Sequence, residues 1–432
     1  MKKLATVLLF LCLCTITGCS GNTPGELLRP APMDEPSEAI RNQVHKSLPP
    51  GARLILPGSP RGSSAIQKID LDQDQRPEIL AFYQKHKEMT VGVLLFPGDG
   101  SKAITVEAPG SEVDYVGRAE IDGKDFPELL IGWSGGADFP KSLNIYRYEN
   151  KKLVNIAEQL YDSLTTGDLD EDGTDDLVVS QREFEEYKCQ VSWLAYKKGG
   201  LQTIDTFGLE TLGVDLSIDR AGKNQMGLFI DGGLGAHSAF SDLRIPVNQR
   251  LQQVLPADNS GLPALTFQPY PVGSQDINGD GIREIGNLKQ PEGYENAAMA
   301  EIAWITQWFQ WDGKNGLNLV LEQYGNYGYG FTFDFPANWR DRITIKKSDQ
   351  EQYFRVDFVD TRTGIDYVEI VSCDTSLRSK VEDRLKEKGR TVSFLGEHDG
   401  YTFFSVVPLQ KNTSYGLDAR ETEQCFHLLK ER

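Results

Sequence analysis

The chain has 432 residues, of which 39% are hydrophobic, and it carries a formal net charge of −18. This length and apolar content allow two or three globular domains, and the 42 Gly and 21 Pro residues indicate many turns. The acidic balance argues against a nucleic-acid-binding protein, because basic side chains do not compensate for repulsion from phosphates.

The N-terminal segment has the parts of a secretory signal: basic residues at 2–3, an apolar run at 4–16 and the small residues 17–18 before Cys19. The apolar run is shorter than the roughly 20 residues that a membrane-spanning helix needs. Ile16-Thr17-Gly18-Cys19 resembles the lipobox of bacterial lipoproteins. That resemblance implies removal of residues 1–18, lipidation of Cys19 and anchoring on the extracytoplasmic face of the cell membrane. The alternative is an ordinary secretory signal.

The segment 19–50 is rich in Pro and poor in large apolar residues, so it cannot bury enough surface to fold alone. We interpret it as a tether that holds a folded domain away from the membrane. A short helix is predicted between Ser37 and Leu48.

A repeat follows the tether. Five segments carry acidic or equivalent residues at positions 1, 3, 5 and 9; they are 70–80, 120–130, 168–178, 217–227 and 276–286. Aromatic or apolar strands that end in polar turns keep the same phase, at 93–100, 143–150, 193–200 and 308–314. Two independent features in one phase make chance similarity improbable.

Each repeat has the pattern of four short strands separated by Gly, Pro and Asp. In the first repeat these strands are 65–69, 78–83, 90–96 and 102–107. Four-stranded units of this length are typical of the blades of a β-propeller. The sequence therefore predicts a mainly β protein with a propeller of about five four-stranded blades over residues 51–325. We expect the segment 52–57 to pair with the last blade and close the ring.

The Asp-rich segments resemble FG-GAP/VCBS-type repeats, which form the blades of calcium-loop β-propellers in integrin α-chains and in many bacterial surface proteins. The resemblance covers about residues 48–325, and with the lipobox and tether it extends to Gram-positive lipoproteins that carry such repeats. Five units are fewer than the seven blades of the integrin type.

Three of the loops have a full set of hard oxygen ligands at alternate positions, as Ca²⁺ requires. The predicted ligands are Asp168, Asp170, Asp172 and Asp176; Asp276, Asn278, Asp280 and Glu284; and Asp70, Asp72, Asp74 and Glu78. Structural calcium with a weak affinity of about 10⁻⁴–10⁻³ M is expected there. The alternative is that Asp, Asn and Gly simply form good turns.

The other two loops are predicted to be free of metal. In the second loop, Lys124 stands at position 5, where its ammonium would take the place of the cation. The fourth loop keeps only Asp219 among the acidic ligands.

Motifs for catalysis are weak. Gly132–Gly136 matches G-x-S-x-G, but a nucleophile elbow needs a helix next, and a further strand is predicted instead. The Gly-rich segment 231–238, with His237, is either a ligand-contacting loop or a connection within a blade. We therefore expect no catalytic residues, and no cofactor other than Ca²⁺.

Residues 326–432 are predicted to form a small α+β domain. Strands are expected at 331–335, 343–346, 353–359, 366–372, 391–395 and 401–407, and a helix at 376–388. Three cysteines remain beyond Cys19, and Cys373–Cys425 is the favoured pair if a disulfide forms.

These features predict a lipid-anchored envelope protein that binds or scaffolds a protein or glycan without catalysis. A carbohydrate-active hydrolase or lyase on the same scaffold is the alternative, because propellers host both kinds of function.

Overall fold

The computed structural model describes residues 38–429, except 125, 137–139, 184–186, 212, 236–237, 260, 388 and 408–414. The protein is mainly β, as predicted, and its strands form antiparallel sheets of four or five strands. The described helices are α3 (Glu38–Ser47), α4 (Arg378–Glu387) and α5 (Ala419–Cys425). Short 3-10 turns lie at His86–Glu88, Ala264–Thr266, Met299–Glu301, Ala337–Trp339 and Thr375–Leu377. None of the helices within the described ranges is long and apolar enough to cross a membrane.

Five sheets follow one another along the chain. The first contains β1 (Arg53–Leu54), β2 (Ile66–Ile69), β3 (Glu78–Lys85), β4 (Thr90–Phe96) and β5 (Ile104–Pro109). The second contains β6 (Glu112–Ala119), β7 (Glu128–Ser134), β8 (Lys141–Glu149) and β9 (Lys152–Tyr161). The third contains β10 (Ser163–Gly167), β11 (Asp176–Glu183), β12 (Lys188–Lys197) and β13 (Gly200–Leu209).

The fourth sheet contains β14 (Val214–Gly222), β15 (Gln225–Gly233), β16 (Ala239–Val247) and β17 (Arg250–Gln253). The fifth contains β18 (Ile285–Lys289), β19 (Ile305–Trp311), β20 (Leu317–Asn326), β21 (Phe331–Phe335) and β27 (Phe426–Leu428). In this sheet the first strand of the repeat is reduced to one bridge between Gln275 and Glu284.

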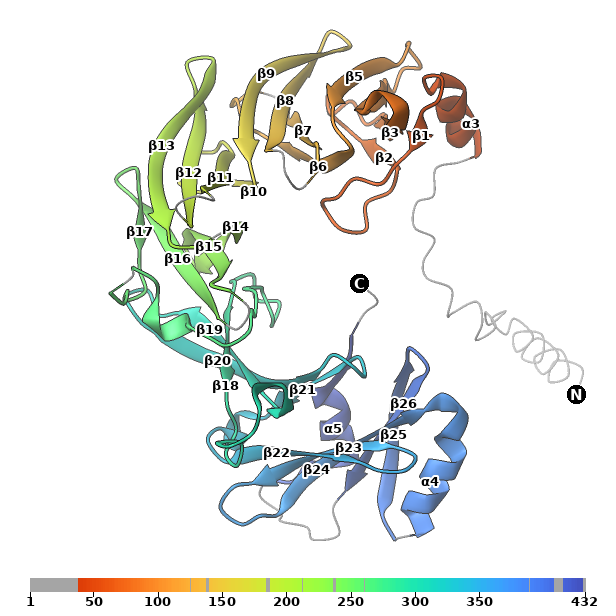
Figure 1. Ribbon diagram of the computed structural model, residues 1–432, viewed down its shortest axis with the longest axis vertical. Helices are drawn as coiled ribbons and strands as arrows, with labels where there is room; N and C mark the ends of the chain where they lie inside the picture. The colour runs from red at the N-terminus through yellow and green to blue at the C-terminus, as the bar shows by residue number, and fades with distance from the viewer. Residues whose placement is uncertain are drawn as a thin grey trace, which may run out of the picture.

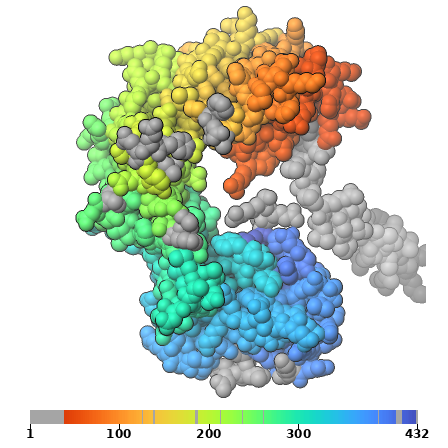
Figure 2. All heavy atoms as spheres, viewed as in Figure 1, coloured from red at the N-terminus to blue at the C-terminus, as the bar shows by residue number. Residues whose placement is uncertain are grey.

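The sheets are stacked face to face along an open arc, with the first sheet and the C-terminal region at its two ends (Figure 1). Figure 2 shows the same curvature with side chains drawn. Separate apolar clusters fill the spaces between consecutive sheets. Because the second strand of a sheet touches cores on both faces, its central residues are apolar, and every residue of β7 is buried.

The N-terminal segment does not pair with the last sheet, so the prediction for residues 52–57 is wrong. Arg53 and Leu54 of β1 pair with Gln84 and Tyr83 of β3, in the first sheet. The four-residue β2 covers only the first half of the edge of β3. The second half therefore offers free backbone groups to β1 within its own sheet.

The C-terminal sheet has the order β22-β23-β24-β26-β25. Its strands are β22 (Ile343–Asp349), β23 (Phe354–Asp360), β24 (Asp366–Asp374), β25 (Thr391–His398) and β26 (Tyr401–Val407). Helix α4 covers one face through Val381 and Leu385. An aromatic cluster that includes Phe331 and Trp339 packs on the other face. Strand β27 pairs with β21, so the end of the chain joins the fifth sheet.

The structure also contradicts the favoured disulfide, because Cys373 and Cys425 are both free thiols. Cys373 lies under α4, with Val381. Cys425 packs against the aromatic cluster on the opposite face of the sheet. The two thiols belong to different cores, although their segments lie in one domain. The predicted helices at 37–48 and 376–388 are confirmed as α3 and α4.

Candidate metal centres

The Asp-rich loops connect the first and second strands of a sheet. The first loop (70–77) joins β2 to β3, the second (120–127) joins β6 to β7, and the third (168–175) joins β10 to β11. The fifth (276–283) lies between the bridging residues Gln275 and Glu284. The fourth is only the tight turn at 223–224 between β14 and β15.

The acid at position 9 is buried in all four long loops. Its carboxylate accepts a hydrogen bond of 2.8 to 3.1 Å from the backbone N–H of position 2; the pairs are Leu71–Glu78, Ile121–Glu128, Leu169–Asp176 and Ile277–Glu284. Burial raises the pKa of Glu78 and of Glu284, and it raises the pKa of Asp176 to about 7. A cation beside these carboxylates would remove this cost of ionisation.

The acid at position 1 accepts hydrogen bonds from backbone N–H groups later in the loop. Asp168 accepts hydrogen bonds from the backbone N–H groups of Asp172 (2.9 Å) and Gly173 (3.0 Å). Asp276 does the same with Gly279 (2.7 Å) and Gly281 (2.9 Å). This hydrogen bonding brings the side chain at position 1 toward the other acids of the loop.

Three groups of carboxylates come together, and they belong to the three loops predicted to hold metal. In each group one oxygen per residue lies within 4.8 Å of the others; the groups are Asp70, Asp72 and Glu78; Asp168, Asp170 and Asp172; and Asp276, Asp280 and Glu284.

The remaining predicted ligands lie beside these groups. Asp74 accepts a hydrogen bond from the N–H of Arg76 (2.7 Å), and Asp176 is engaged by Leu169 as described. Asn278 Nδ2 is 3.2 Å from oxygens of both Asp280 and Glu284.

Two cations reach the second loop. The guanidinium of Arg147, in β8, contacts Asp122, and its Nε lies 3.6 Å from Glu128. Lys124 Nζ is 3.6 Å from Asp122, and its side chain is 61% exposed. Lys124 therefore pairs with one acid of the loop, as predicted, but the arginine, which was not predicted, is the cation that reaches both buried carboxylates.

An arginine also pairs with the acid of the fourth repeat. Arg283, from the fifth loop, lies 3.0 Å from Asp219 and donates a hydrogen bond to Ser217 (3.2 Å). The backbone N–H of Arg283 also donates to the carbonyl of Arg220 (2.9 Å). The remaining acid of the fourth repeat is thus neutralised by its neighbour.

The three acidic groups differ from these two loops. Across the described ranges, no Lys or Arg forms an ion pair with the carboxylates of the three groups. The strand register explains the difference. The residue after each position-9 acid pairs with Phe96, Tyr146, Leu194 or Phe309 of the third strand in the first, second, third and fifth sheets. The next residue of the third strand, toward the acid, is Pro97, Arg147, Ala195 or Gln310. Only Arg147 is charged. An alignment of the third strands of the repeats would therefore have pointed to Arg147 as the cation of the second loop.

The G-x-S-x-G segment lies at the end of a strand and is followed by another strand. Ser134 is 2% exposed at the end of β7, its hydroxyl accepts a hydrogen bond from the N–H of Gly136 (3.1 Å), and β8 follows. His237 lies outside the described residues. Asp231, in β15, accepts hydrogen bonds from Ser241 (2.5 Å) and Ser274 (2.6 Å), which joins the fourth sheet to the start of the fifth repeat.

Comparisons with known proteins give no family. No family model matches the chain, and no curated protein matches it. Among solved structures, it is similar to the crystal structure of the uncharacterized protein lmo1340 from Listeria monocytogenes EGD-e. The identity is 11%, the match covers 70% of this chain and 94% of that chain, and the TM-score is 0.24.

Proposed function

We propose that the chain is a lipid-anchored cell-envelope protein of the FG-GAP/VCBS type, with propeller blades pinned by structural Ca²⁺, that binds or scaffolds an envelope protein or glycan without catalysis. The observation that carries the proposal is the contrast among the loops. Where an arginine pairs with the acids of a repeat, those acids are neutralised. The acids of the other three loops converge without such a partner, and a bound cation would neutralise them.

The blade assignment is supported by the packing. Each apolar core lies between two consecutive sheets, and the sheets turn about a common centre along the arc (Figure 1). The position-9 acid anchors each long loop at the start of the second strand. A cation in such a loop would hold two strands of one blade together, which is a structural rather than a catalytic role.

Calcium should raise the melting temperature. With an affinity of about 10⁻⁴–10⁻³ M, about 5 mM Ca²⁺ stabilises the protein by roughly 1–2 kcal/mol for each occupied loop. Thermal melts in Ca²⁺ and in EDTA measure this difference. Asp172→Ala should remove the share of the third loop, and Asp215→Ala, at an exposed carboxylate of β14, should keep the full response. Identical melts in Ca²⁺ and EDTA would show that the loops are ordinary turns.

Lipidation is tested separately, because Cys19 lies outside the described residues. Helix α3, at which the described residues begin, docks on the first sheet through Val44, which is 1% exposed. Cells that express the full chain should incorporate labelled palmitate into the protein, and globomycin should block cleavage of the signal. Cys19→Ser should carry no label and leave the membrane fraction. Equal labelling of both forms rules out this anchor.

A further inference from the structure

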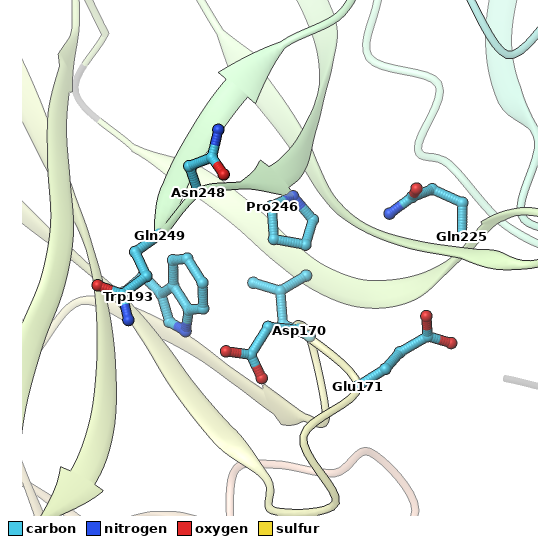
Figure 3. A pocket seen from close by; sticks show the side chains of 8 residues that line it. Asp170, Glu171, Trp193, Gln225, Pro246, Asn248 and Gln249 are labelled. Carbon is cyan, nitrogen blue, oxygen red and sulfur yellow. The ribbon is translucent and has the colours of Figure 1, made fainter.

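A cavity of about 290 Å³ opens between the third and fourth sheets, beside the third loop (Figure 3). Asp170, a member of the third acidic group, lines it. Gln225, the first residue of β15, lies across from it, and Asn248 and Gln249 contribute the turn between β16 and β17. Amides of the fourth sheet thus face Asp170, a carboxylate of the candidate metal centre in the third.

The indole of Trp193, in β12, forms one wall of the cavity and is 1% exposed. Its N–H interacts with the carboxylate of Asp176 and opposes the rise in the pKa of that group, so it is not available to a ligand.

The charge of the cavity argues against an anionic ligand. Three carboxylates converge in the third group, so one bound Ca²⁺ leaves that group with a net charge of about −1. An anionic ligand would meet Glu171 and a protein of net charge −18. Amides both donate and accept hydrogen bonds, as pairs of neighbouring hydroxyl groups do.

The metal would also have room for ligand oxygens. Ca²⁺ takes about 6–8 oxygen ligands, and the third group supplies three carboxylates that converge. Asp170 is exposed and lies on the cavity side of the loop (Figure 3). The ring of Pro246 lies across the cavity from it and offers an apolar surface to the C–H groups of a ligand.

We propose that this cavity binds a neutral sugar, with hydroxyl groups that reach the Ca²⁺ of the third loop and the amides of Gln225, Asn248 and Gln249. The inference rests on the calcium loops of the proposed function and names the ligand class of one of them. It makes the third loop a binding site, whereas the first and fifth loops remain structural.

The test measures metal and sugar separately on the mature chain. Calorimetric titration with Ca²⁺ measures the metal sites. Saturation-transfer NMR with glucose, galactose, mannose and N-acetylglucosamine, in Ca²⁺ and in EDTA, measures sugar binding. At least one hexose should bind in Ca²⁺ and lose its signal in EDTA.

A double variant isolates the sugar contacts. Asn248 and Gln249 have φ of 51° and 61°, so Asn248→Gly with Gln249→Gly removes both amides without straining the turn. It should weaken sugar binding about 10-fold or more while Ca²⁺ binding is kept. Asn150→Gly is the matched control, because Asn150 has a φ of 49° in the corresponding turn of the second sheet. It should bind sugar as the parent does.

The outcomes separate the two proposals. Ca²⁺ binding without a signal from any hexose overturns the sugar site alone. Sugar binding that survives EDTA or the double variant also overturns it, because the ligand then lies elsewhere. Failure of the third loop to bind Ca²⁺, seen as equal titrations of Asp168→Ala and the parent, overturns the calcium proposal and the metal-bridged site with it.

Discussion

Replacing Arg147 by Met is expected to lower the free energy of unfolding by about 3 kcal/mol at neutral pH. The guanidinium contacts Asp122 and Glu128, whose side chains are each 1% exposed. Without it, two buried carboxylates share one loop with no cation. Burial and the charge of Asp122 raise the pKa of Glu128 to about 7, so uptake of a proton relieves part of the cost. Urea denaturation of the variant and parent measures the loss.

Lys124→Met is the matched control, because it also removes one positive charge from the same loop. Its ammonium is mostly exposed and 3.6 Å from Asp122, so the expected change is within about 0.5 kcal/mol. Equal losses in the two variants would show that the lysine neutralises the loop as much as the arginine does.

A rescue connects Arg147 to the metal loops. Arg147→Gln with Lys124→Asp gives the second loop an aspartate at position 5 and a glutamine in the third strand, as in the fifth, where Gln310 donates hydrogen bonds to Glu284 (2.7 Å) and Asp280 (2.9 Å). This variant should be unstable in EDTA and recover in Ca²⁺, with one more calcium bound than in the parent. Recovery without Ca²⁺ would contradict the view that the arginine stands in for a metal.

The repeat made much of the fold predictable. Asp-rich turns alternate with apolar strands at a constant phase, and the position-9 acids Glu78, Glu128 and Asp176 are the first residues of β3, β7 and β11. Alternation within a strand was equally informative, since Phe331, Phe333 and Phe335 are all buried in the C-terminal aromatic cluster. Periodicity succeeds here because every sheet must bury the same faces against its neighbours.

The loop sequence alone does not reveal the arginine that reaches the second loop. Lys124 is close in sequence, but Arg147 reaches Glu128 only because β7 and β8 pair antiparallel, with Leu129 opposite Tyr146. The disulfide prediction was wrong for a similar reason, because sequence separation does not say on which face of a sheet Cys373 and Cys425 lie. The prediction that residues 52–57 close the ring was wrong because β1 pairs instead with the half of the β3 edge that β2 leaves open.

Short elements at the end of the chain were also missed. Helix α5 begins with a capping box, in which Asp418 accepts a hydrogen bond from the N–H of Glu421 (2.8 Å) and Glu421 accepts one from the N–H of Asp418 (2.9 Å). This pattern is readable in the sequence. Strand β27 is only three residues long, so no periodicity can reveal it, and its pairing with β21 is decided by tertiary contacts.

The second large effect is expected from pH and concerns Asp357 in the C-terminal sheet. Burial raises the pKa of Asp357 to about 7; Arg355, at 2.9 Å, opposes this rise, and the charges of Glu369 and Asp366 add to it. Arg390 contacts Glu369 and also acts against the rise in the pKa of Asp357. Between about pH 4 and 7 the folded protein therefore holds a proton that the unfolded chain has released.

Stability should accordingly fall as the pH rises through this window and level off above the folded-state pKa. Asp357 alone should contribute a loss of about 2–3 kcal/mol between roughly pH 5 and pH 8. Asp357→Asn should remove that share, so its loss of stability over the same range, measured by urea denaturation in saturating Ca²⁺, should be smaller than that of the parent. Asp383→Asn, at an exposed carboxylate of α4 that does not contribute to the shift of Asp357, should keep the slope of the parent. If Asp357→Asn is instead less stable than the parent at about pH 8 and keeps the same slope, then Asp357 is ionised in the folded protein, and its ion pair with Arg355 outweighs its burial.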